Sequence, residues 1–233
     1  MRVLLFCVAA AFAAAGVTFP TTASVATLDG NKLAAVWGIP AKSTRGVVFV
    51  HQYGRNKEDW QFLAEKLYRD GNAVLAVDLR GHGANVTAGA PELAAADFQA
   101  MVGDVGAAIA LLQARGVTRI CLVGAELGAN LAVNVAVDNP AVVSLVLLSP
   151  GMEYKGIIAA DAVKRYGARP VALVAGTDDV YGARSAASLD ATAAGEHTFQ
   201  LLDGAGKGTK MLNRAPSLEG WIVGWVGTHW GAQ

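Results

Sequence analysis

The sequence predicts an α/β protein with one mostly parallel central sheet and helices on both faces. Two observations lead to this fold class. Apolar runs alternate with helix-compatible segments through the whole length of the chain, and each apolar run is continuous rather than alternating with polar residues. Continuous runs are typical of strands that are buried on both faces, as in a parallel sheet covered by helices.

The first elements follow from turn signals. A hairpin or one long strand is expected over residues 25–37, because Asp29-Gly30 is a turn dipeptide inside an apolar segment. The run of valine and phenylalanine over residues 46–50 predicts a buried strand. The next helix is expected over residues 57–69 and would end before Gly71, since glycine favours the backbone conformation that terminates a helix.

From residue 73 onward, β-rich and helix-compatible segments continue to alternate. No internal repeat or low-complexity linker interrupts them, so one domain is expected. The segment between the strands at 142–148 and 171–175 leaves room for one helix but not for a cap domain. The remaining strands are expected over residues 73–77, 120–123, 142–148, 171–175 and 197–202, and the helices over 94–114, 129–136, 156–166, 183–194 and 216–228.

Composition and charge exclude several classes of function. The chain has 233 residues, of which 53% are hydrophobic and 16% charged, which supports a sizeable core and argues against disorder. Lys+Arg and Asp+Glu both number 19, so the net charge is zero. Neither a nucleic-acid partner nor an anionic membrane surface is expected from this balance.

The N-terminus has the features of a secretory signal. Arg2 precedes an apolar stretch over residues 3–15 that is short for a membrane span, and small-residue cleavage patterns end at Ala23 and Ala26. We therefore expect a leader over residues 1–23, a domain over 24–233, export to the periplasm or exterior, and no membrane contact after cleavage. An uncleaved anchor or a first buried strand remains the alternative.

Cysteine usage is consistent with that division. Cys7 would leave with the leader, and the mature chain would then hold one cysteine, Cys121. A single cysteine can form no internal disulfide. Its place in the middle of an apolar run predicts a small core residue.

The most informative motif is Gly124-Ala125-Glu126-Leu127-Gly128. An apolar run precedes it and a helix-compatible run follows, which is the strand-turn-helix setting of a nucleophile elbow. Flanking glycines allow a strained turn that presents the central side chain beyond the sheet. Here that side chain is a glutamate where a serine hydrolase carries its serine.

Four other loops follow predicted strands, where ligands of parallel sheets bind. They are His51-Gln52-Tyr53-Gly54, Asp78-Leu79-Arg80-Gly81-His82-Gly83, Gly176-Thr177-Asp178-Asp179 and Gly204-Ala205-Gly206-Lys207-Gly208-Thr209. Together with the elbow, and in this order, they resemble the α/β-hydrolase family, above all its small members without a cap, such as dienelactone hydrolases and esterases. The resemblance covers essentially all of the chain after the leader.

The resemblance implies a role for six positions. Glu126 stands at the nucleophile position, Asp179 at that of the acid and Lys207 at that of the base, where the family has a histidine. The oxyanion donors would be the backbone N–H of Leu127 and that of Gln52 or Tyr53. Two of the three catalytic positions therefore depart from the family pattern, while their order along the chain is kept.

Chemistry leaves three functions open. A carboxylate attacks esters poorly and a protonated lysine cannot act as a base, so a secreted, weakly active or inactive hydrolase relative is the first hypothesis. The second is an active hydrolase of small esters, lactones, epoxides or halides that uses Glu126 as nucleophile or base. The third is a ligand-binding module that uses the old pocket. In each, the partner is a small molecule.

The substitutions at Glu126 and Lys207 are opposite in charge, so an ion network of Glu126, Lys207 and Asp179 is expected at the top of the sheet. His51 and His82 are interpreted as loop architecture rather than as bases. Asp178 is the alternative acid if the register is off by one. No cofactor is expected, and no metal, because no ligand-spacing motif is present and Lys207 would repel a cation.

Overall fold

The computed structural model describes residues 16–89 and 92–231. They form one eight-stranded sheet with the strand order β1-β2-β4-β3-β5-β6-β9-β10. All neighbouring pairs from β4 to β10 are parallel, whereas β2 runs antiparallel to both β1 and β4. The bounds of the sheet strands are β1 Val17–Ala26, β2 Lys32–Ile39, β3 Arg45–Val50, β4 Ala73–Val77, β5 Arg119–Ala125, β6 Val142–Leu148, β9 Val171–Gly176 and β10 His197–Leu202.

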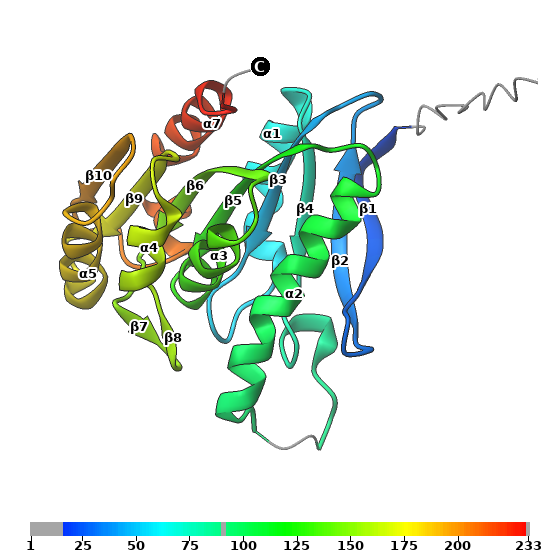
Figure 1. Cartoon of the computed structure of the whole chain (residues 1–233), viewed down its shortest axis with the longest axis horizontal. Helices are drawn as coiled ribbons and strands as arrows, with labels where there is room; N and C mark the ends of the chain where they lie inside the picture. Colours follow the sequence, from blue (N-terminus) through cyan, green and yellow to red (C-terminus); the bar gives the residue numbers. More distant parts are fainter. Residues whose placement is uncertain (1–15, 90–91, 232–233) are drawn as a thin grey trace, which may run out of the picture.

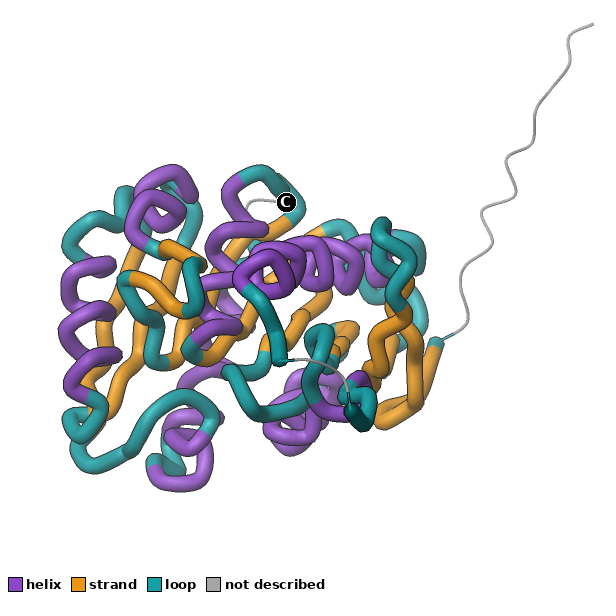
Figure 2. The backbone as a smooth tube through the Cα atoms, turned by 90° about the horizontal axis from the view of Figure 1, so that it is seen from below, coloured by secondary structure: helices purple, strands orange, loops and turns teal. Residues whose placement is uncertain are grey.

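Helices cover both faces of this sheet (Figures 1 and 2). One apolar core lies between the sheet and helices α2, α3, α4 and α5, and a second lies between the sheet and α1, α6 and α7. Alternate residues of β3 point into the two cores, Val48 and Val50 into the first and Val47 and Phe49 into the second. The helix bounds are α1 Gln61–Arg69, α2 Ala95–Gln113, α3 Leu127–Val137, α4 Ala160–Tyr166, α5 Val180–Asp190, α6 Lys210–Arg214 and α7 Leu218–Thr228.

The α2 helix and Cys121 on β5 illustrate how the core accommodates apolar segments. The α2 helix is long and apolar enough to cross a membrane by composition, yet Phe98, Met101 and Val105 are buried in the first core. Core helices pass the same compositional test as membrane spans. Cys121 on β5 is fully buried, as expected, and burial raises the pKa of its thiol to about 12.

The sequence-based boundaries differ from the structure most at the first strand and before α4; in addition, α5 starts at Val180 and ends at Asp190 instead of spanning 183–194, and α6 has no counterpart in the prediction. The first strand starts at Val17, so β1 takes up part of the segment that the leader prediction assigns to residues 1–23; residues 1–15 lie outside the described part of the chain. The helix expected over 156–166 begins only at Ala160. Lys155 and Gly156 both have positive φ, 52° and 82°, and these make the turn of a short hairpin instead.

That hairpin consists of β7 (Glu153–Tyr154) and β8 (Ile157–Ile158). With α4 it fills the connection from β6 to β9, so the described chain has no cap domain. Asn130 on α3 anchors the connection, because its amide donates to Ile157 O and accepts from Gly151 N–H. The carboxyl ends of the parallel strands are therefore left accessible, which is where the predicted motifs lie.

Candidate active site

Glu126 occupies a sharp turn between β5 and α3. Its φ of 47° and ψ of −113° lie in a backbone region that residues with a Cβ rarely adopt. The flanking glycines make the turn possible: a Cβ on Gly124 would lie 2.4 Å from Gly128 O, and one on Gly128 would lie 2.2 Å from Val50 O. The backbone at this point is thus a nucleophile elbow that carries a carboxylate.

The Glu126 side chain is only 8% exposed and has one counter-ion. Its Oε2 lies 3.2 Å from Lys207 Nζ, while Oε1 is buried without a hydrogen-bond partner among the described residues. Burial raises the pKa of this carboxyl; Lys207 opposes that shift, and the charge of Asp179 adds to it. Because the Lys207 side chain is 53% exposed, solvent weakens its part of the compensation.

Lys207 belongs to a loop that four strand ends hold in place. Four consecutive residues of this loop each bond to a side chain that follows a different strand: β9, β5, β6 and β3. The four contacts are Gly206 N–H to Asp178 Oδ1 (2.7 Å), Lys207 Nζ to Glu126 Oε2 (3.2 Å), Gly208 N–H to Ser149 Oγ (2.9 Å) and Thr209 N–H to Gln52 Oε1 (2.8 Å). We call these contacts the loop clamp.

Besides Glu126 and Gly206, two further members of the loop clamp have a positive φ. Gly208 has a φ of 57°, and a Cβ there would lie 2.0 Å from Gln52 Oε1. Ser149 is fully buried and also has a positive φ, 49°. In the sequence, no Gly-x-x-x-Gly frame surrounds Ser149, which is followed by Pro150. Its role as a support for the last loop depends on a contact with Gly208 that no local pattern signals.

Asp179 does not join the ion pair. Its Oδ1 accepts the Gly182 N–H at 3.1 Å and so caps the N-terminus of α5, and its Oδ2 is buried without a partner. Within residues 16–89 and 92–231, no ion pair joins Asp179 to Lys207. The network expected from the sequence therefore contains two members in contact, with Asp179 as a near neighbour. Asp178, the alternative acid, belongs to the loop clamp.

The three residues expected to supply oxyanion donors, Leu127, Gln52 and Tyr53, make different contacts. Ala129 and Asn130 donate to Glu126 O, whereas the Leu127 N–H has no acceptor in the described protein. Gln52 turns its side chain toward Thr209. Tyr53 is 48% exposed, and its ring packs edge-on against His82. The Leu127 N–H is thus placed at the positive end of α3, as an oxyanion donor would be.

The His51 imidazole makes its hydrogen bonds to the backbone and not to the ion pair. His51 is buried, and its Nδ1 lies 2.8 Å from Gln52 O while its Nε2 lies 3.0 Å from the Leu79 nitrogen. Since a carbonyl accepts and an amide N–H donates, His51 carries its proton on Nδ1. Burial lowers the pKa of His51 to about 4, so the ring is neutral near pH 7.

The other three histidines are also accounted for. His82 Nδ1 lies 2.9 Å from Arg80 O, and His197 and His229 pair with Asp190 and Glu196. None of the four histidines, all of which the structure describes, is hydrogen-bonded to Glu126 or Lys207. The ion pair therefore has no imidazole base beside it.

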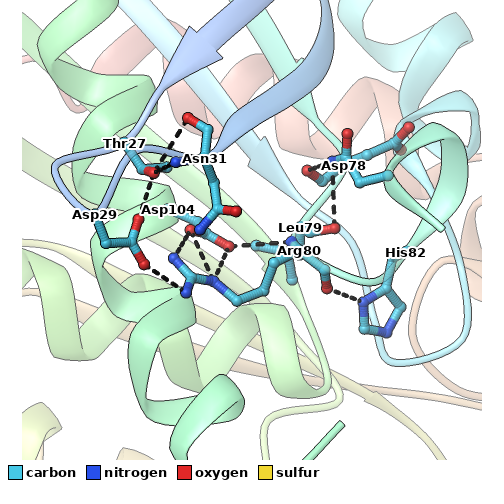
Figure 3. A network of polar contacts seen from close by, with 9 residues as sticks. Thr27, Asp29, Asn31, Asp78, Leu79, Arg80, His82 and Asp104 are labelled. Atoms are coloured by element: carbon cyan, nitrogen blue, oxygen red, sulfur yellow. Dashed lines mark hydrogen bonds and ion pairs between the residues drawn. The ribbon is translucent and has the colours of Figure 1, made fainter. Parts of the chain in front are cut away.

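The Asp78-to-Gly83 turn is held by charged contacts of its own (Figure 3). Arg80 forms a forked contact with the buried Asp104, through its Nε and Nη2 atoms. Its Nη1 also forms a single ion pair with Asp29 Oδ2 at 2.7 Å. Asp78, fully buried, accepts from both the backbone and the ammonium group of Lys57, at 2.8 and 2.7 Å. These charges are compensated by Lys57, Asp29 and Asp104 from neighbouring elements, which supports the interpretation of the turn as architecture.

Two cavities flank the site. One, of about 540 Å³, lies beside Tyr53, Arg80 and His82, and the other, of about 380 Å³, lies beside Asp179 and Lys207. Tyr154 responds to the same charges: burial raises the pKa of its hydroxyl, and the charges of Glu126 and Asp179 add to the effect. Among the described residues, no cluster of three or more His, Cys, Asp or Glu side chains could hold a metal.

Comparison with known proteins places this geometry in context. The model of a family described as serine aminopeptidase, S33, matches residues 41–177. That match includes the elbow and ends before Asp179 and the last loop. Among curated proteins, none has a sequence that matches this chain significantly.

Solved structures share the fold at low sequence identity. Dienelactone hydrolase from Anabaena variabilis superposes with a TM-score of 0.75 at 18% identity, covering 91% of this chain and 98% of the other. Esterase Pf2001 from Pyrococcus furiosus gives 0.72 at 16% identity, covering 91% of both chains. An esterase from Exiguobacterium antarcticum gives 0.71 at 15%, covering 89% of this chain and all of its own. The α/β-hydrolase fold predicted from the loops is confirmed.

Proposed function

Because the chain belongs to the serine aminopeptidase S33 family of α/β hydrolases, we propose that it is a weakly active or inactive hydrolase relative, with Glu126 and Lys207 in place of the nucleophile and base. One observation carries the proposal. Glu126 sits at the strained elbow position and its carboxylate contacts Lys207, with no imidazole bonded to either residue in the described chain.

The chemistry of this pair opposes ester hydrolysis. Attack of the Glu126 carboxylate on an ester would form a mixed anhydride and expel a much more basic alkoxide, which is uphill. The second step needs a base to activate water, and no imidazole is hydrogen-bonded to Glu126 or Lys207 in the described chain. Loss of one triad member usually costs several powers of ten in rate, about 10³ to 10⁶.

The ion pair also occupies the space of the reacting groups. Lys207 Nζ lies 3.2 Å from Glu126 Oε2, on a loop fixed by the loop clamp. Removing either partner leaves the other charge without its counter-ion. Loss of Lys207 should cost more stability than loss of Glu126, because the remaining Glu126 carboxylate is mostly buried whereas a remaining Lys207 ammonium group is half exposed to water. The pair therefore acts as a polar plug over an otherwise intact hydrolase frame.

The direct test is the double reversion E126S/K207H. The loop clamp holds residue 207 over residue 126, so the double variant is expected to gain turnover of p-nitrophenyl acetate and labelling by a fluorophosphonate. The wild-type protein and both single variants should show neither. A third variant, E126S/K207H/D179N, serves as the control, because it removes the acid that a restored triad would require.

Robust turnover by the wild-type protein that E126A abolishes would overturn this proposal. It would instead favour Glu126 as nucleophile or base, which a covalent adduct on Glu126 in mass spectrometry with activated alkyl substrates would establish.

A further inference from the structure

The smaller cavity at the strand ends has an unusual distribution of charge. It measures about 380 Å³ and lies between the turn from β9 into α5 and the last loop with α6. That volume suits a small organic molecule. Its lining residues are Asp178, Asp179, Val180, Gly206, Lys207, Lys210 and Arg214.

Three cations reach this cavity from one segment. Lys207 lies in the loop before α6, while Lys210 and Arg214 are four residues apart on α6, the spacing of neighbours on one helix face. The Lys207 and Arg214 side chains are 53% and 55% exposed. In the described part of the chain, Lys210 has no carboxylate within 4.0 Å.

The neighbouring carboxylates already contact protein donors or are mostly buried, although the Asp178 side chain is 44% exposed and lines the cavity. Asp178 Oδ1 accepts the Gly206 N–H, and its Oδ2 faces Arg214 at 3.5 Å. The unpartnered oxygens Glu126 Oε1 and Asp179 Oδ2 are both buried from solvent. A molecule entering the cavity therefore meets the charged groups of Lys207, Lys210 and Arg214 together with the Asp178 carboxylate, and the nearby N-terminus of α5 adds positive potential.

The backbone that carries Lys207 is fixed in position, and the Arg214 side chain lies against it. The loop clamp holds Gly206 to Thr209, and the Arg214 side chain crosses Gly206, where a Cβ would lie 3.2 Å from Arg214 Nη1. Donors that are already ordered cost less conformational entropy on binding. The arrangement therefore favours binding of an anion over a loose electrostatic attraction.

We propose that this cavity binds the carboxylate group of a small organic acid, with Lys210 as the main contact and Lys207 and Arg214 on either side. The inference rests on the proposed function in one respect, since the ligand stays intact beside a site that does not cleave it. Glu126 competes for Lys207, and burial raises the pKa of Glu126. Affinity should therefore increase as Glu126 becomes neutral, at pH values where the ligand's carboxyl group stays ionised, because the Glu126 charge acts on both Lys207 and Lys210.

The test compares an acid with its uncharged isostere. Isothermal titration of the wild-type protein with sodium benzoate should give saturable binding, and benzamide should bind about tenfold more weakly or worse. K210Q should weaken benzoate binding by about tenfold, which corresponds to about 1.4 kcal/mol. The matched control is K164Q, which removes an exposed lysine on α4 and should leave the affinity unchanged.

Equal affinities for benzamide and benzoate, or equal losses in K210Q and K164Q, would overturn the carboxylate site. So would the absence of binding by benzoate and by acetate, butyrate and succinate. Failure of the proposed function has a different signature. Turnover of p-nitrophenyl acetate by the wild-type protein would refute inactivity, while benzoate binding would persist and inhibit that turnover competitively.

Discussion

Glu126 combines three unfavourable features in one residue: a left-handed backbone, a buried carboxylate and an oxygen without a donor. Backbone strain of this kind typically costs about 1–3 kcal/mol, and a buried unpartnered acceptor a similar amount. Lys207 offsets only part of this, because half of its side chain is in water. Such costs are typical of sites kept for function rather than for stability.

The pH dependence of stability follows from the sign of the Glu126 shift. Burial raises the pKa of this carboxyl in the folded state above its unfolded value of about 4.3. The contribution of the protonated group is fully present below the unfolded pKa and is lost as the pH rises through the folded pKa. At neutral pH, ionised Glu126 therefore lowers the free energy of unfolding.

E126Q should remove this cost. We expect the variant to unfold in urea with a free energy about 1 kcal/mol higher than the wild-type protein near pH 7, and the difference to vanish toward pH 4. E65Q is the control, since Glu65 is exposed and pairs with Arg69 on the same helix. A lower stability of E126Q near neutral pH would show that the Lys207 contact outweighs desolvation.

At the scale of elements, the loop clamp links four strand ends to one loop. β3, β5, β6 and β9 are neighbours in the sheet, so their carboxyl ends form a row. Side chains following each of them hold four consecutive residues of the loop after β10. The loop position of Lys207 thus depends on sheet topology as well as on the Glu126 contact.

The glycine at position 208 tests the loop clamp. G208A would introduce left-handed strain, about 1 kcal/mol, together with a clash against Gln52 worth about another 1–3 kcal/mol. G204A is the matched control, because Gly204 has nearly the same φ, 56°, with nothing within 4 Å of an added Cβ. Urea denaturation should show a clearly larger loss for G208A; equal losses would mean that Gln52 yields and the loop is not held tightly.

At the scale of the whole molecule, the first strand bears on how the chain is processed. β1 pairs with β2 from Val17 opposite Ile39 to Ala26 opposite Lys32, and the Phe19 ring packs on Tyr68 with centroids 6.0 Å apart. Cleavage after Ala23 would remove most of that strand from the sheet. The leader itself remains a prediction, with its apolar stretch outside the described residues.

We therefore expect an exported mature chain to begin before Val17. N-terminal sequencing of protein recovered from a bacterial periplasm measures this directly. A chain starting at residue 16 should keep the full melting temperature. A chain starting at residue 24 loses most of the β1–β2 pairing, so its free energy of unfolding should fall by about 1–3 kcal/mol and its melting temperature by several degrees. A mature N-terminus at residue 24 with unchanged melting temperature would contradict the expectation.

The sequence by itself determined the elements and the elbow. Apolar runs fix buried strands, and Gly124 and Gly128 fix the turn around Glu126, because both signals act between residues close in the chain. The order of the strand-end loops was enough to predict the α/β-hydrolase fold. The start of β1 and the hairpin before α4 were missed, since edge pairing and positive φ at Lys155 leave little trace in hydrophobic pattern.

Only the tertiary structure decided how the site residues are used. Glu126 and Lys207 are 81 positions apart and Gln52 and Thr209 are 157 apart, so their contacts depend on how the sheet orders its strands. Asp179 stands at the acid position that the resemblance implies, and the structure adds a contact that the sequence did not signal, because its Oδ1 accepts the Gly182 N–H and caps α5. Local sequence restricts backbone conformation, whereas the partner of a buried charge is set by the three-dimensional packing around it.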